Sequence, residues 1–112
     1  LRLRAAGGNR ALANSYVVVQ GAWKNSRSIS ARLDEHAPSL LSRSDRRVEP
    51  NRRYHGRLVR KARVLEWYVD DLTTPFLRLD DPEPLIGPGH EYFGFGNWET
   101  DTYFDNLVIK RL

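Results

Sequence analysis

Two short segments bring carboxylates close together along the chain, an arrangement that glycoside hydrolysis requires. Glu99 and Asp101 are two residues apart, so on a strand they would share one face about 7 Å apart. Glu35 lies between Asp34 and His36, but consecutive strand residues point to opposite faces. Retaining glycosidases hold two carboxyl groups about 5–5.5 Å apart and inverting ones about 6.5–9.5 Å apart. We expect both segments to be solvated faces, and Glu35, Glu99 and Asp101 are the only carboxylates to test for catalysis.

Aromatic and planar polar side chains near turns form a second set. Sugar recognition uses aromatic faces against C–H surfaces and planar groups that hydrogen-bond to hydroxyls. Trp23, Tyr92 and Trp98 adjoin turn or loop residues, where the core has less need of an aromatic side chain. Simple packing is the alternative for each of them. The residues expected to bind a ligand are Trp23, Asn25, Arg27, His36, His90, Tyr92 and Trp98.

Metal binding is a lesser alternative. The three histidines lack the HxH or HxxxH spacing of a zinc site, and the chain has no cysteine for a thiolate ligand or a disulfide. Asp105 with Asn106, or Asp80 with Asp81, offers the oxygen ligands that Ca²⁺ prefers. We favour a hydrogen-bonded pair at a sheet edge over structural calcium, and we expect no other cofactor.

Charge is spread unevenly along a chain whose formal net charge is +4. Residues 1–63 hold 15 Lys or Arg against 4 Asp or Glu, and residues 64–112 hold 3 against 10. Strands from the two halves can neutralise each other, and we prefer this interpretation to a basic binding face. Residues 43–63 hold nine Lys or Arg but only one aromatic, whereas single-strand nucleic acid binders need several. We expect no nucleic acid partner, and the guanidinium groups suit an anionic polysaccharide better.

Alternating hydrophobicity predicts an antiparallel hairpin near the middle of the chain. Residues 54–60 and 64–70 both alternate and are joined by Lys61-Ala62-Arg63. Leu65, Trp67 and Val69 share one face of the second strand, and we assign that face to the core.

The rest of the chain predicts further short strands. The consecutive valines in residues 15–23 predict a central strand covered on both faces. Other strands are expected at residues 1–5, 27–35, 47–49, 74–79, 90–96 and 102–112, with no helix and no apolar run of the 18 residues that a membrane span needs. The pattern predicts an all-β fold, a β-sandwich of two antiparallel sheets. The chain opens without Met inside an alternating run, so we expect one sandwich domain over residues 1–112 that is part of a larger domain or protein.

Several short motifs follow one another in order: Leu65-Glu66-Trp67-Tyr68-Val69-Asp70, Asp81-Pro82, Gly89-His90, Phe93-Gly94-Phe95 and Phe104-Asp105-Asn106-Leu107. This order resembles concanavalin A-like lectin/glucanase domains, in particular bacterial sugar-associated ones of the LamG-like or keto-glycoside hydrolase-like branch. The resemblance implies a jelly-roll sandwich with its ligand on the concave face of one sheet or in loops at the rim. The chain departs from the family at Lys61-Ala62-Arg63, which lacks the turn glycine, and at Asp71, where glycine normally follows Val-Asp.

The resemblance also bears on function. Laminarinase-type hydrolases of this fold place Glu, Asp and Glu at alternating positions of one strand, and no Glu-x-Asp-x-x-Glu is present. We therefore expect a non-catalytic lectin-type module that binds a polysaccharide or glycoconjugate, outside the cell or in the cell envelope. One alternative is a glycoside hydrolase or polysaccharide lyase-like enzyme of the same fold. The other is a structural or adhesive domain that binds protein in a larger assembly.

Overall fold

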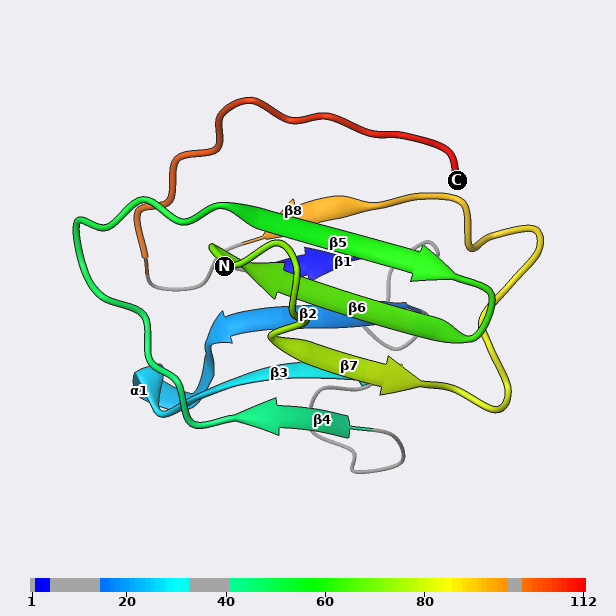
Figure 1. The fold of residues 1–112 in the computed structure, drawn as a ribbon, viewed down its shortest axis with the longest axis horizontal. Helices are drawn as coiled ribbons and strands as arrows, with labels where there is room; N and C mark the ends of the chain where they lie inside the picture. The colour runs from blue at the N-terminus through cyan, green and yellow to red at the C-terminus, as the bar shows by residue number, and fades with distance from the viewer. Residues whose placement is uncertain (1, 5–14, 33–40, 97–99) are drawn as a thin grey trace.

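The computed structural model describes residues 2–4, 15–32, 41–96 and 100–112 (Figure 1). Its elements are β1 (Arg2–Arg4), β2 (Tyr16–Gly21), α1 (Ala22–Asn25), β3 (Arg27–Arg32), β4 (Leu41–Ser44), β5 (Gly56–Lys61), β6 (Val64–Val69), β7 (Leu77–Asp80) and β8 (Gly94–Gly96). The described strands form two antiparallel sheets, with the orders β4-β3-β2-β1-β8 and β5-β6-β7. The fold is mostly β, as predicted. The predictions at Glu35, His36, Trp98 and Glu99 lie outside the described residues.

The valine-rich strand β2 lies in the middle of the larger sheet, between β3 and β1. Val17, Val18 and Val19 are all at most 6% exposed. Val18 packs with Tyr16 in the apolar cluster between the sheets, whereas Val17 and Val19 pack with Ile29 on the opposite face. The prediction of a central strand covered on both faces is confirmed.

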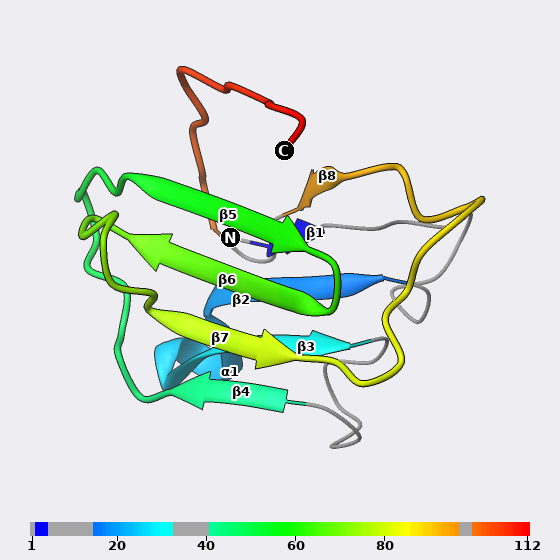
Figure 2. The same ribbon diagram turned by 45° about the vertical axis from the view of Figure 1, so that its right-hand side comes forward.

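One apolar layer joins the two sheets. Leu65, Trp67 and Val69 of β6 are buried in it, so the core face predicted for the hairpin is confirmed. Trp67 also meets Phe76 edge to face, with ring centroids 5.2 Å apart. The other buried members come from both sheets: Tyr16, Val18, Leu77 and Leu79. Figure 2 shows the smaller sheet stacked in front of the larger one.

The central hairpin forms as expected, but its turns differ in detail. β5 and β6 pair from Gly56 and Val69 to Lys61 and Val64, leaving a two-residue turn in which Ala62 has a φ of +51°. A side chain with a Cβ is disfavoured in this region by about 1 kcal/mol. After β6, the positive φ of +63° belongs to Asp70. The left-handed residue of this turn is thus Asp70, one position before Asp71, where the family has glycine.

Some predicted elements differ from those observed. β4 covers Leu41–Ser44 rather than residues 47–49, and a short turn, α1, forms where no helix was expected. Residues 102–112, predicted as the last strand, form no strand. A strand is stabilised by its neighbours, and among the described residues no strand pairs with this segment. The prediction of a final strand is wrong for this reason.

A buried carboxylate ties the two sheets together where β7 ends. Asp81, 0% exposed, accepts hydrogen bonds from the Tyr16 hydroxyl at 2.6 Å and from Arg32 Nη1 at 3.0 Å. The N–H of Glu83 donates to it as well, at 2.9 Å. Burial raises the pKa of Asp81, but these hydrogen bonds and the Arg32 charge outweigh that effect and leave the pKa below its ordinary value. Asp81 is thus an ionised link between β2, β3 and the end of β7.

Candidate ligand-binding site

The connection between β2 and β3 is wound left-handed. Gly21 has a φ of +72°, and Trp23, Lys24 and Asn25 have φ values of +47°, +55° and +59°. Consecutive left-handed residues with side chains cost roughly 1–2 kcal/mol each, because Cβ approaches the following carbonyl. Such strain persists only where surrounding contacts impose it, and it concentrates at functional sites. This turn, α1, is therefore the first candidate for a site.

Two sets of contacts hold the turn. The side-chain amide of Asn25 donates to the carbonyl of Val48 at 2.8 Å and accepts the N–H of Val48 at 2.7 Å. The Ser28 hydroxyl accepts the N–H of Gly21 at 3.3 Å and donates to the carbonyl of Arg46 at 3.2 Å. Both polar atoms of Asn25 are therefore committed to backbone, so Asn25 acts as a support rather than as part of the ligand-contacting set.

An open groove of about 730 Å³ lies beside this turn. Its volume is in the range of ligand-binding pockets. Trp23 is 39% exposed and contacts the groove residue Arg27. The guanidinium carbon of Arg27 is 4.8 Å from the centroid of the Trp23 ring. The lining residues come from the end of the turn, from β3 and β4, and from the residue before β7: Ser26, Arg27, Arg43, Ser44, Asp45 and Phe76.

The groove carries positive charge that the described residues do not neutralise by ion pairing. Neither Arg27 nor Arg43 has an ion pair with a described carboxylate. Among the residues that the structure describes, Asp45 is the one carboxylate that lines the groove. Arg46 is used differently, since it stacks over Phe76 at 5.3 Å and pairs with Asp70 at 3.6 Å. The guanidinium groups of Arg27 and Arg43, with the Trp23 ring beside Arg27, suit an anionic ligand with apolar C–H surfaces.

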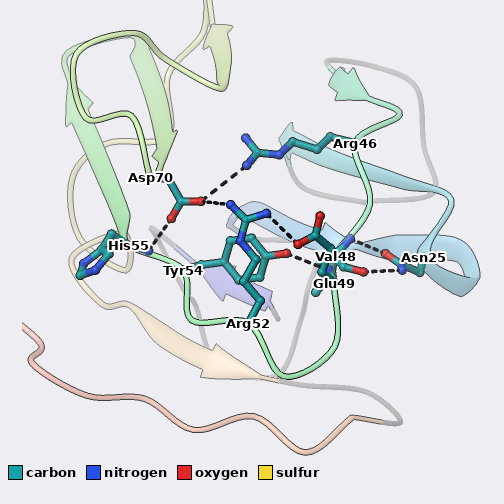
Figure 3. A network of polar contacts seen from close by, with 8 residues as sticks. All are labelled: Asn25, Arg46, Val48, Glu49, Arg52, Tyr54, His55 and Asp70. Atoms are coloured by element: carbon teal, nitrogen blue, oxygen red, sulfur yellow. Dashed lines mark hydrogen bonds and ion pairs between the residues drawn. The ribbon is translucent and has the colours of Figure 1, made fainter.

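A polar network fixes the chain segment that follows Val48, as Figure 3 shows. Asp70 accepts a hydrogen bond from Arg52 at 2.8 Å and one from the N–H of His55 at 3.0 Å. Arg52 also bonds Glu49 at 2.9 Å and stacks over Tyr54 at 4.7 Å. The Tyr54 hydroxyl accepts the N–H of Glu49 at 2.8 Å. These contacts hold residues 49–55, and so the neighbouring Val48 that clamps Asn25, against the end of β6.

The structure brings together only part of the predicted ligand set. Trp23 and Arg27 meet at the groove, but His90 and Tyr92 lie in the connection between β7 and β8. Figures 1 and 2 place that connection at the opposite end of the fold from α1. There the N–H of His90 donates to the Gly87 carbonyl at 3.1 Å, and Tyr92 is exposed. The predicted set is therefore divided between two ends.

Sequence reasoning missed Arg43, Ser44 and Phe76. Arg43 and Ser44 lie in a segment interpreted as loop, and Phe76 follows Pro75 without any polar motif. The sequence signals only a run of arginines from residue 43 onward, and this run does not show which of the arginines line a common groove.

The described carboxylates with shifted pKa values are unsuited to acid catalysis. The hydroxyl and N–H of Thr73 and the N–H of Thr74 lower the pKa of Asp71 to about 2. The pKa of Asp81 also lies below its ordinary value. A glycosidase general acid needs the opposite shift. The remaining candidate Asp101 is exposed, in a segment that is not a strand, so strand spacing says nothing about its partner.

Metal ligands do not gather in the described part of the chain. Residues 2–4, 15–32, 41–96 and 100–112 contain no group of three or more His, Asp or Glu side chains that could hold a metal ion. Asp80 is paired with Arg63, and Asp105 accepts the N–H of Asn106 at 2.8 Å. Calcium at Asp105 and Asn106 stays a prediction. The helical residues that the structure describes include no segment long and apolar enough to cross a membrane.

Comparisons of the chain with protein-family models, with curated proteins and with solved structures found no match.

Proposed function

We propose that the protein is a non-catalytic carbohydrate-recognition module that binds an anionic polysaccharide or glycoconjugate in the groove beside α1. The observation that carries this proposal is the left-handed turn, which holds Trp23 against Arg27 at the edge of the groove. A turn with three strained side-chain-bearing residues is not required to connect two antiparallel strands, because two residues suffice. The strain is better explained by the position that it gives to Trp23.

The chemistry of the groove matches that class of ligand. The Trp23 ring, 39% exposed and stacked with Arg27, provides an aromatic surface beside the groove for sugar C–H groups, and Arg27 and Arg43 offer paired donors for a carboxylate or sulfate. The hydroxyls of Ser26 and Ser44 can exchange hydrogen bonds with sugar hydroxyls. Stacking on Trp23 limits the rotamers of Arg27, so less conformational entropy is lost when a ligand binds.

We also propose that the fold belongs to the concanavalin A-like sandwiches and that the protein works outside the cell or in its envelope. Two antiparallel sheets around one apolar layer support this fold, and the motif order in the sequence supports the family. The jelly-roll connectivity and the place of the chain in a larger protein are part of the same proposal.

Titration calorimetry with uronic acid-containing, sulfated and neutral oligosaccharides tests the function. We expect the acidic sugars to bind and their affinity to fall with salt, because guanidinium contacts are screened. Trp23→Ala and Arg43→Ala should each weaken binding about tenfold or more, which corresponds to about 1.4 kcal/mol. Arg53→Ala is the matched control, since Arg53 is exposed, lies outside the groove lining and has no ion pair among the described residues.

The outcomes separate the alternatives. Equal losses for Arg43→Ala and Arg53→Ala would show that net charge, not the groove, attracts the sugar. Release of reducing ends from any of these sugars, lost on Glu99→Gln, would replace the binding module with an enzyme.

A further inference from the structure

Large exposed hydrophobic side chains gather at one end of the sequence. Ten of the thirteen in the described residues lie between residues 86 and 112. They are Ile86, Tyr92, Phe93, Phe95, Tyr103, Phe104, Leu107, Val108, Ile109 and Leu112. Isolated exposed hydrophobic residues are common, but six of these ten lie in the single segment 103–112, which makes that segment a candidate for an interaction.

The end of the chain has the sequence of a strand and lacks a strand partner among the described residues. In an extended conformation, Asp105, Leu107, Ile109 and Arg111 would lie on one face and Phe104, Asn106, Val108 and Lys110 on the other, yet none of them is part of a strand. Phe104 packs on Phe95 with ring centroids 4.3 Å apart, and this contact anchors the segment beside β8. Figures 1 and 2 show the segment, in red, running apart from both sheets. The N–H of Asn106 donates to the Asp105 side chain, but no backbone–backbone hydrogen bond joins residues 104–112 to the rest of the described chain, so the segment can pair with another chain.

We infer that residues 104–112 pair antiparallel with the same residues of a second copy of this chain, about a two-fold axis at Val108. Charge complementarity favours a second copy as the partner, because in this pairing Asp105 faces Arg111 of the second copy. On that same face Leu107 meets Ile109. The two-fold axis repeats both pairs, so the face has an apolar centre and an ion pair at each end.

The opposite face is self-complementary in the same register. Val108 meets Val108 of the second copy, Phe104 meets Leu112, and Asn106 meets Lys110. A shift by one residue would set Asn106 against Ile109 and Phe104 against Arg111, which leaves polar groups against apolar ones. In the register centred on Val108, every apolar side chain therefore faces an apolar one and every polar side chain faces a polar one.

Backbone geometry adds one requirement. Asn106 has a φ of +54°, so it must move to the extended region when the strands pair. That change removes a left-handed conformation that costs a non-glycine residue roughly 1 kcal/mol, although asparagine tolerates it better than most. Pairing is therefore not opposed by the local backbone preference.

Sedimentation equilibrium of the full chain over a wide concentration range tests the inference. We expect a monomer–dimer equilibrium. Asp105→Arg sets arginines against each other at both ends of the paired segment and should raise the dimer dissociation constant about tenfold. The double variant Asp105→Arg/Arg111→Asp reverses both charges and should restore the dimer. Asp101→Arg is the control, since it makes the same charge change outside the paired segment.

Each outcome decides the inference, and circular dichroism confirms that every variant is folded. A monomer at all concentrations overturns it, as does an open assembly larger than a dimer, which would mean pairing that does not close on a two-fold axis. Equal weakening by Asp101→Arg and Asp105→Arg, or failure of the double variant to recover, also overturns it. The inference is independent of the glycan proposal, because Trp23→Ala should leave the dimer unchanged.

Discussion

Replacing Gly21 by alanine tests whether the left-handed turn is held as rigidly as its contacts suggest. Gly21 has a φ of +72°, a region that costs alanine about 1–2 kcal/mol. A Cβ at this position would also lie 2.8 Å from Cγ2 of Val48 and 3.1 Å from Oδ1 of Asn25. Overpacking of this kind typically costs about 1–3 kcal/mol. We therefore expect Gly21→Ala to lower the free energy of unfolding by about 2–5 kcal/mol.

Two other glycines separate the backbone effect from the steric effect. Gly87 has a φ of +88°, but an added Cβ there would meet no atom within 4 Å, so Gly87→Ala should cost only about 1 kcal/mol. Gly56 has neither a positive φ nor a close neighbour, so Gly56→Ala should be neutral or slightly stabilising. From the most to the least stable, the expected order is Gly56→Ala, then Gly87→Ala, then Gly21→Ala.

Urea denaturation at constant m-value measures these differences, and thermal melts should show a fall of about 4 °C per kcal/mol for a chain of this size. Combining Gly21→Ala with Val48→Ala removes the closest clashing atom, so the double variant should lose less stability than the sum of the two single changes. If Gly21→Ala costs no more than Gly87→Ala, the close approach of Val48 is not a rigid feature. The idea that Val48 holds the left-handed turn in place is then refuted.

Three further predictions concern the contacts around the two sheets. Ala62→Gly should raise the free energy of unfolding by about 1 kcal/mol, because Ala62 holds a φ of +51° in the hairpin turn, and the urea midpoint checks it. Asn25→Ala should cost about 2–3 kcal/mol in the same assay, because both backbone groups of Val48 lose their partner. Asp81→Asn should cost about 2–4 kcal/mol, because it leaves the Arg32 charge without its buried partner. The pKa of Asp81 in the folded protein lies below its unfolded value of about 3.9. The ionised carboxylate therefore contributes to the free energy of unfolding above about pH 3.9, and this contribution is lost as the pH falls through the folded-state pKa. Asp81→Asn should therefore flatten the dependence of the free energy of unfolding on pH below about 4. Acid titrations followed by circular dichroism would contradict this if the wild-type protein and the Asp81→Asn variant lost stability in parallel.

The central strand and the core face of the hairpin were predictable from the sequence, because both depend on neighbouring residues. The valines of β2 and the alternation of Leu65, Trp67 and Val69 identified a central strand and a core face, because side-chain period and burial are properties of neighbouring residues. The apolar and β-branched residues in 102–112 also predicted a strand, but none forms within the described chain. Pairing depends on a partner that is distant in sequence, and a pattern of apolar residues does not reveal whether that partner exists.

The candidate site was predictable only where one segment supplies it. Trp23 and Arg27 are close in sequence and lie at a recognisable turn, so both were identified. Phe76 reaches the same groove from 49 residues beyond Arg27 along the chain, and nothing near it in the sequence indicates a site. The left-handed winding was also hidden, because neither Trp23 nor Lys24 favours positive φ. Asn25 was assigned to the ligand because its amide suits sugar hydroxyls, but the same geometry suits the backbone of Val48.

The polar network around Asp70 explains how the strained turn α1 is held in place. A left-handed turn of three side-chain-bearing residues would relax unless something external held it. Val48 supplies that hold through Asn25, and Val48 is fixed because Asp70 and Arg52 anchor the segment that follows it to the end of β6. The anchor lies on the smaller sheet and the turn on the larger one, so docking of the two sheets is what sets the position of Trp23. Under the proposed function, a ligand at the groove would meet an aromatic side chain and a guanidinium whose positions are fixed by sheet packing, and this would lower the entropy lost on binding.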